Sequence, residues 1–161
     1  ITSDHGDEFD EHGGLSHDGK MYQELLWVPL LIFDPSREEK DVCEKLVSTI
    51  DIPPTIVHIF GLEPIKGFQG QSLIPTAEYK EKGCFGEAIE KFGPRVKETD
   101  KETYYYMEKD LKVIYRGNTD SWELYNLQDD PRELRSITGA SPEEERMKDI
   151  PKPRIGRWTR R

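Results

Sequence analysis

Apolar residues along this chain follow two patterns, one before and one after residue 83. In the first part they form a continuous run over 25–33 and recur at helical spacing from Ile52 to Phe60. The continuous run is typical of a strand buried in a parallel sheet, and the recurrence is typical of a helix that packs along one side. In the second part, short aromatic and branched segments alternate with turn residues, which predicts antiparallel strands. We therefore expect an α/β fold: the tail of a mostly parallel sheet flanked by helices, followed by a small antiparallel sheet subdomain with a C-terminal helix.

Residues that start or stop regular structure set the limits of the expected elements. A helix is expected over 20–27 and a helix or loop over 38–48. Asp51 is placed to cap a third helix, with Pro53 in its first turn, Gly61 at its end, and a packed face made of Ile52, Ile56, Ile59 and Phe60.

The second part of the chain predicts four strands and two helices. The strands are Cys84–Ile89, Tyr104–Met107, Leu111–Tyr115 and Ser121–Tyr125, of which the last three form a meander. A short helix is expected from Asp130, and another opens at Ser141 with an N-terminal capping box. We expect three regions: residues 1–82 as the C-terminal part of an α/β core, residues 83–140 as a small antiparallel β subdomain, and residues 141–161 as a charged C-terminal tail.

Composition narrows the range of functions. The 161 residues are 34% hydrophobic and carry a formal net charge of -9. The low share of apolar residues fits an incomplete domain that packs against another layer of structure. The negative net charge argues against nucleic-acid binding, which needs clustered Lys and Arg. No apolar run is long enough to cross a bilayer, and the two cysteines form neither a zinc spacing nor a disulfide framework. Localisation stays open.

The most informative stretch is Ile1-Thr2-Ser3-Asp4-His5-Gly6. It places a carboxylate and an imidazole where a short apolar strand meets a glycine, and ligands bind at the carboxyl ends of strands in α/β sheets. Successive strand side chains point to opposite faces, so Asp4 and His5 can share an ion only where the strand geometry breaks, which Gly6 permits. The pair predicts a metal site. The alternative is an Asp-capped turn with an exposed histidine.

The order of motifs in the chain resembles the C-terminal part of the sulfatase family of the alkaline phosphatase superfamily. Asp4-His5-Gly6 is followed by an acidic glycine-rich loop, a basic residue, Tyr22 and Glu24 on the expected helix, and Val28-Pro29-Leu30. Nearer the C-terminus, two segments are similar to the family's K-x-I-x and E-L-Y-N-L-x-x-D-P-x-E signatures: Leu111–Arg116 and Glu123–Leu134. The resemblance covers residues 1–138.

This resemblance implies a metal-dependent hydrolase of sulfate esters whose nucleophile lies upstream. Family members attack with a Cys-derived formylglycine, or with Ser or Thr, in a C/S-x-P-x-R segment, and neither Cys43 nor Cys84 has Pro and Arg at the required offsets. We therefore expect a fragment, or one part of a longer protein, that is inactive alone and whose partners are the rest of the same polypeptide and an anionic sulfate or phosphate ester. Asp4 and His5 are the implied metal ligands. Ca²⁺ is the first expectation for the metal, with Mn²⁺, Mg²⁺ or Zn²⁺ as alternatives.

The group that binds the ester oxygens is less sharply indicated. The family places a basic residue four positions before the helix aromatic, but Asp18 holds that offset from Tyr22. His17 is therefore the first candidate and Lys20 the second. The alternatives are a loop histidine bonded to backbone and a solvated lysine at the start of a helix.

Two other functions stay open. A phosphodiesterase, phosphonate hydrolase or phosphoglycerol transferase of the same superfamily would differ in its upstream nucleophile. A noncatalytic remnant or interaction module would lack metal affinity, and loss of Asp4 would change nothing in it.

Overall fold

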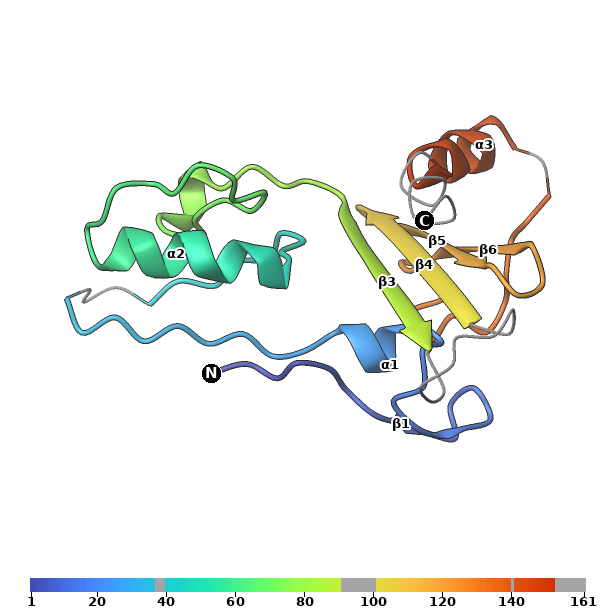
Figure 1. The fold of residues 1–161 in the computed structure, drawn as a ribbon. Helices are drawn as coiled ribbons and strands as arrows, with labels where there is room; N and C mark the ends of the chain where they lie inside the picture. The colour runs from blue at the N-terminus through green and yellow to red at the C-terminus, as the bar shows by residue number, and fades with distance from the viewer. Residues whose placement is uncertain (37–39, 91–100, 140, 153–161) are drawn as a thin grey trace. The chain divides into compact units, whose positions relative to one another are not determined.

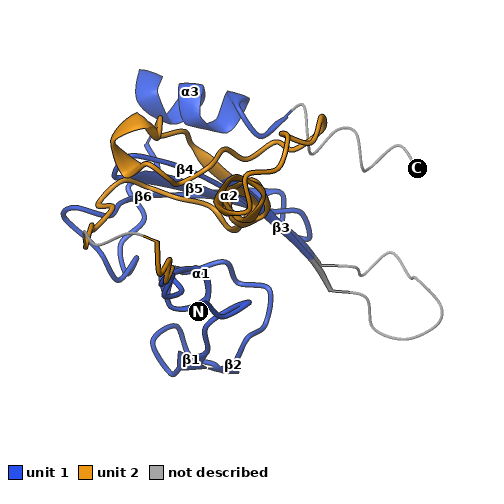
Figure 2. Ribbon diagram, turned by 90° about the vertical axis from the view of Figure 1, so that its left-hand side faces the viewer, with its two compact units in different colours: residues 1–31, 85–161 blue, residues 32–84 orange. Residues whose placement is uncertain are grey.

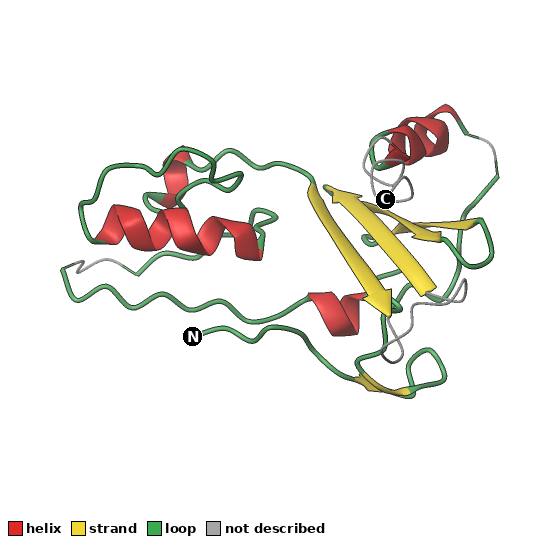
Figure 3. Cartoon of the chain, viewed as in Figure 1, coloured by secondary structure: helices red, strands yellow, loops and turns green. Residues whose placement is uncertain are grey.

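The structure, a computed structural model, describes residues 1–36, 40–90, 101–139 and 141–152 (Figure 1). The chain divides into two compact units, of which the first comprises residues 1–31 and 85–161 and the second residues 32–84 (Figure 2). Helices and strands occur together, and the described sheets are small, with loops over much of the chain (Figure 3). The mixed α/β fold class is thus confirmed. The predicted domain limits after residues 82 and 140 stay predictions.

The first unit is built on a four-stranded sheet. Its strands lie in the order β3 (Cys84–Glu90), β4 (Lys101–Glu108), β5 (Leu111–Arg116) and β6 (Ser121–Asn126). β4, β5 and β6 pair antiparallel, which confirms the predicted meander. The turn between β4 and β5 contains Lys109 with φ of 53°, and the loop before β6 contains Asp120 with φ of 48°.

One helix covers the core of this sheet. α3 (Pro142–Asp149) brings the fully buried Met147 against Val113 of β5 and Leu124 of β6. The helix begins as predicted, because the Ser141 hydroxyl accepts a hydrogen bond of 3.1 Å from the Glu144 amide. The sheet and α3 thus share one small apolar core.

Two other helices of this unit differ from the prediction, in each case because of a left-handed residue. α1 (Gln23–Leu26) is shorter than the expected 20–27, and Met21, with φ of 64°, cannot be part of a right-handed helix. The helix expected from Asp130 is a turn, in which the Glu133 amide donates to the Asp130 carbonyl at 3.0 Å and Glu133 has φ of 54°.

The buried strand expected within 25–33 is also not found as predicted. Among the described residues it makes one isolated antiparallel bridge, between Thr2 and Leu30. Leu31 and Phe33 are 59% and 88% exposed. Apolar sequence alone therefore did not secure burial here, since burial requires a second layer against the segment.

The second unit contains η1 (Thr49–Asp51), α2 (Ile52–Ile59) and η2 (Thr76–Glu78). Gly61 ends the α2 region as predicted, with φ of 61°. Asp51 is the N-cap residue, but its buried carboxylate accepts hydrogen bonds from the amides of Ser48 and Gln71 and from the Tyr79 hydroxyl, at 3.0, 2.8 and 2.9 Å. It therefore joins the chain before α2 to the loop after it.

The predicted apolar face of α2 is wrong. Ile56, Ile59 and Phe60 are 49%, 37% and 72% exposed, whereas Thr55 is 1% exposed. The Thr55 hydroxyl donates to the Asp51 carbonyl at 2.6 Å and accepts from the Leu73 amide at 2.9 Å. Hydrogen bonding, rather than apolar packing, orients this helix. The described residues 40–48 are loop, not helix.

Candidate functional site

The acidic loop folds as a small hairpin in the first unit. β1 (Glu8–Phe9) pairs antiparallel with β2 (Leu15–Ser16), and Glu8 lies opposite Ser16. The loop between them closes with a hydrogen bond of 2.8 Å from the Asp10 amide to the Gly14 carbonyl. Both Asp10 and Gly13 have φ of 77°, a conformation that glycine and aspartate adopt more readily than most residues.

A buried carboxylate holds this hairpin together. Glu8 is 1% exposed and accepts hydrogen bonds from the His12 and Gly14 amides at 2.9 and 2.7 Å and from the Lys20 ammonium at 2.7 Å. Burial by itself would raise the pKa of Glu8, but these donors outweigh it, and the pKa lies below its ordinary value. The same contact raises the pKa of Lys20.

A second set of contacts docks the segment onto the sheet. The Arg116 guanidinium donates to both Glu123 oxygens, at 2.8 and 3.1 Å, and to the Lys20 carbonyl at 2.6 Å. The Tyr22 and Tyr125 hydroxyls also donate to Glu123, at 3.1 and 2.9 Å. Burial would raise the pKa of Glu123, but the hydrogen bonds from Arg116 and the tyrosines lower it. The first glutamate of the E-L-Y-N-L motif is therefore a docking residue.

A buried ion pair lies under the same segment. Lys112 Nζ is 2.6 Å from Glu133 Oε1, and both side chains are 0% exposed. The other Glu133 oxygen accepts from the Gln23 amide at 2.6 Å, so the pair also fixes the start of α1. Burial lowers the pKa of Lys112 and raises that of Glu133, each against the attraction of its partner. Lys112 is the lysine of the K-x-I-x motif, and Glu133 is the glutamate of the D-P-x-E motif.

His12 orders the loop, as its acidic surroundings suggest. Its Nδ1 is 2.6 Å from Glu24 Oε1, its Nε2 is 3.2 Å from the Glu133 carbonyl oxygen, and its ring stacks on Tyr22 at 3.7 Å. Glu8, His12 and Glu24 place ligand-type atoms within 4.8 Å of one another, but the contacts above already engage them. This cluster is therefore a structural one.

The two predicted metal ligands lie side by side on the surface. Asp4 Oδ1 accepts from the His5 amide at 3.1 Å, and Asp4 Oδ2 is 3.8 Å from His5 Nε2. His5 Nδ1 is 2.9 Å from the Gly6 carbonyl oxygen, which can only accept, so Nδ1 carries the hydrogen and the neutral ring keeps its lone pair on Nε2. A metal-binding histidine commonly has this backbone partner. The Asp4 side chain is 89% exposed.

Gly6 holds this pair against α1. Its amide donates to the Leu25 carbonyl at 2.9 Å, and a Cβ at this position would lie 2.0 Å from the Glu24 carbonyl oxygen. The glycine is therefore required by close backbone approach.

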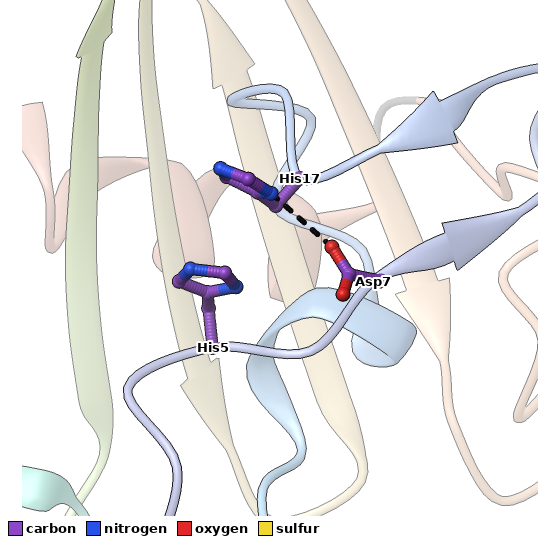
Figure 4. Close-up of side chains that lie close together, drawn as sticks. All are labelled: His5, Asp7 and His17. Atoms are coloured by element: carbon purple, nitrogen blue, oxygen red, sulfur yellow. Dashed lines mark hydrogen bonds and ion pairs between the residues drawn. The ribbon is translucent and has the colours of Figure 1, made fainter.

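Of the two predicted anion-binding groups, the structure brings only His17 to the Asp4–His5 pair. The rings of His17 and His5 stack with centroids 4.3 Å apart and planes at 24° (Figure 4). Lys20 instead has its ammonium on Glu8.

Sequence reasoning missed Asp7, whose Oδ1 is 3.1 Å from His17 Nδ1. Ligand-type atoms of His5, Asp7 and His17 lie within 4.8 Å of one another. The signal that could have revealed Asp7 is the pairing register of the β1–β2 hairpin. The donor set of carboxylate oxygens and imidazole nitrogens fits a divalent cation, with nitrogen shifting preference toward Mn²⁺ or Zn²⁺ and oxygen toward Ca²⁺ or Mg²⁺.

Comparisons with known proteins agree with one another. The family described as N-sulphoglucosamine sulphohydrolase, C-terminal, matches residues 11–155. An N-acetylglucosamine-6-O-sulfatase of Bacteroides thetaiotaomicron is 28% identical over 158 residues, which cover 92% of this chain and 28% of that protein. Arylsulfatase K of Bos taurus is 32% identical over 152 residues, which cover 88% of this chain and 27% of that protein. The chain therefore spans little more than a quarter of the length of these relatives.

Solved structures share the fold. A protein in complex with its substrate, D-glucosamine-2-N,6-O-disulfate, matches with a TM-score of 0.71 and 25% identity, over 98% of this chain and 34% of that one. A 2-O GAG sulfatase matches with a TM-score of 0.78 and 21% identity, over 98% of this chain and 35% of that one. Among the described residues, none of the helices has the length and apolar character that crossing a membrane requires.

Proposed function

The chain belongs to the N-sulphoglucosamine sulphohydrolase C-terminal family of sulfatases, and from this premise we propose that it is the C-terminal portion of a metal-dependent sulfate ester hydrolase. Its resemblance to the C-terminal part of sulfatases is thereby confirmed. In this proposal the chain supplies metal and anion ligands to an active site whose nucleophile lies in another part of the polypeptide.

The observation that carries the proposal is the stacking of His17 on His5 beside Asp4. An Asp4 carboxylate oxygen and His5 Nε2 are the atoms that would hold the metal. When bound, a divalent cation polarises the nucleophile and stabilises the negative charge that develops on the ester oxygens. Ca²⁺ remains the first expectation.

His17 would bind the anion as an imidazolium, in which Nδ1 donates to Asp7 and Nε2 is left to donate to an ester oxygen. Lys20 is the weaker candidate, since an ammonium already paired with a buried carboxylate has less to offer a second anion. In either case the residue that attacks the ester is expected upstream, as formylglycine in a sulfatase, and the chain alone is expected to be inactive.

The substrate proposed is a sulfated amino sugar. The support comes from one relative named an N-acetylglucosamine-6-O-sulfatase and from one solved structure that holds D-glucosamine-2-N,6-O-disulfate. The alternative is phosphoryl chemistry by a phosphodiesterase, phosphonate hydrolase or phosphoglycerol transferase, with an upstream Ser or Thr. A noncatalytic remnant or interaction module is the remaining alternative.

The test is the turnover of glucosamine 6-sulfate and of the corresponding phosphate ester by the intact polypeptide. We expect sulfate release, and a fall in kcat/KM of at least about 100-fold for Asp4→Ala, because removing a metal ligand removes charge stabilisation in the transition state. Asp18→Ala is the matched control, an exposed aspartate of the same segment, and should retain activity.

Three results would separate the alternatives. Hydrolysis of the phosphate ester alone would move the protein to phosphoryl chemistry. Full activity of Asp4→Ala would refute the role of Asp4. No hydrolysis of either ester, together with no heat of binding when the metal-free polypeptide is titrated with Ca²⁺, Mn²⁺ or Zn²⁺, would identify a noncatalytic protein.

A further inference from the structure

We propose that Asp7 is a positioning residue, which fixes the ring of His17 so that Nε2 is the nitrogen presented to the substrate anion. The inference rests on the proposed function, because it concerns how the proposed anion-binding group is held. It adds a residue that neither the motifs nor the comparisons point to.

The hairpin register makes Asp7 and His17 neighbours. Glu8 lies opposite Ser16 at the end of the antiparallel β1–β2 pair, so Asp7 and His17 are the next residues beyond the ladder on its two sides, and their side chains meet at 3.1 Å. His5 precedes Asp7 by two residues, and its ring stacks on that of His17. Three residues at positions 5, 7 and 17 thus converge, and Figure 4 shows both rings and the carboxylate together.

The backbone that carries this contact is held firmly. Glu8 follows Asp7 directly and accepts hydrogen bonds from the His12 and Gly14 amides and from Lys20. The Asp7 and His17 side chains are themselves 52% and 59% exposed, so their contact contributes little to stability. The contact instead sets the orientation of the His17 ring.

Two contacts restrict the His17 ring. Its Nδ1 donates to Asp7 Oδ1 at 3.1 Å, because a carboxylate oxygen can only accept. One face of the ring is covered by His5, with centroids 4.3 Å apart. The atom left to meet an ester oxygen is Nε2, which donates to that oxygen when the ring is protonated on both nitrogens. Partners of this kind set which histidine nitrogen is available, and their loss in metal sites costs about 10–100-fold in affinity or activity.

Nitrogen-detected NMR of the His17 ring in the intact polypeptide tests the geometry directly. At a pH where the ring is neutral, we expect the hydrogen on Nδ1 in the wild type. Asp7→Ala should move it toward Nε2, whereas Asp7→Asn, which keeps an acceptor oxygen, should leave it on Nδ1. Asp18→Ala removes an equal charge next to His17 and should leave the hydrogen on Nδ1. This control separates the specific hydrogen bond from the general electrostatic effect of a nearby carboxylate.

Kinetics of the intact polypeptide test the consequence. Asp7→Ala should lower kcat/KM about 10–100-fold, with Asp7→Asn retaining most of it. An unchanged His17 tautomer, or unchanged kcat/KM, in Asp7→Ala would overturn the proposal while Asp4→Ala still tests the proposed function separately. A fall in metal affinity in Asp7→Ala, measured by titration with Zn²⁺ or Ca²⁺, would also overturn it, because Asp7 would then be a ligand itself.

Discussion

The buried pair of Lys112 and Glu133 offers the sharpest test of how the N-terminal segment is held. Both side chains are fully buried, with 2.6 Å between the charged atoms, and Glu133 also accepts from the Gln23 amide. The perturbation is the replacement of each residue, alone and together, by an apolar residue of similar size: Lys112→Met, Glu133→Leu and the double variant.

The expected magnitudes follow from what each change leaves behind. Lys112→Met leaves Glu133 without its cation and should cost about 3–5 kcal/mol of unfolding free energy. Glu133→Leu leaves a buried ammonium and also removes the acceptor of the Gln23 amide, a further cost of about 1–3 kcal/mol. The double variant should lose only the acceptor of the Gln23 amide, because replacing a whole buried ion pair by apolar residues is often neutral or stabilising.

Urea unfolding of the three variants and the wild type, followed by circular dichroism, gives this cycle. We expect Lys112→Met to be less stable than the double variant, and the sum of the two single costs to exceed the double cost by about 6 kcal/mol or more. If a single variant does not fold and the double variant does, the two charges are likewise shown to be coupled. Single costs that simply add in the double variant would refute the reasoning, because the two charges would then not be coupled.

Further predictions concern the loop and the cysteines. Gly6→Ala places a methyl group 2.0 Å from the Glu24 carbonyl oxygen and should destabilise the loop by about 1–3 kcal/mol, seen as faster hydrogen exchange of the Gly6 and His12 amides; unchanged exchange would contradict the close approach. Folding lowers the pKa of Glu8, so the stabilisation that Glu8 contributes is present above the ordinary pKa of 4.5 and is lost as the pH falls through the pKa of the folded state. Protection of the His12 and Gly14 amides from hydrogen exchange should therefore fall over that pH range in the wild type. In Glu8→Gln this protection should be low and independent of pH over the same range. Burial raises the pKa of the Cys84 thiol to about 11, so iodoacetamide at pH 7.5 should label Cys43 well before Cys84, and equal labelling would be contrary to the structure.

The predictable part of the fold was local. The β4–β5–β6 meander, the start of α3 at Ser141 and the stop at Gly61 each depend on residues close together in the chain, so propensity and turn chemistry suffice. The apolar face of α2 was mispredicted, because Thr55 is buried through hydrogen bonds to distant backbone that periodicity does not reveal.

The candidate site was predictable only in part for the same reason. Asp4, His5 and His17 were found from motif order, and their roles remain proposals. Asp7 was overlooked although it lies among them, since its importance depends on the hairpin register. The structure also gave Lys20 a partner, Glu8, that spacing alone does not reveal.

By itself the sequence determined the sulfatase resemblance, the antiparallel meander and the residues able to bind a cation or an anion, because these depend on residue type and short spacing. Only the tertiary structure decided which of them meet. It brought His17 to His5, committed Lys20 to Glu8 and paired Lys112 with Glu133, since such contacts depend on backbone paths that bring distant segments together and on the cost of burying a charge without a partner.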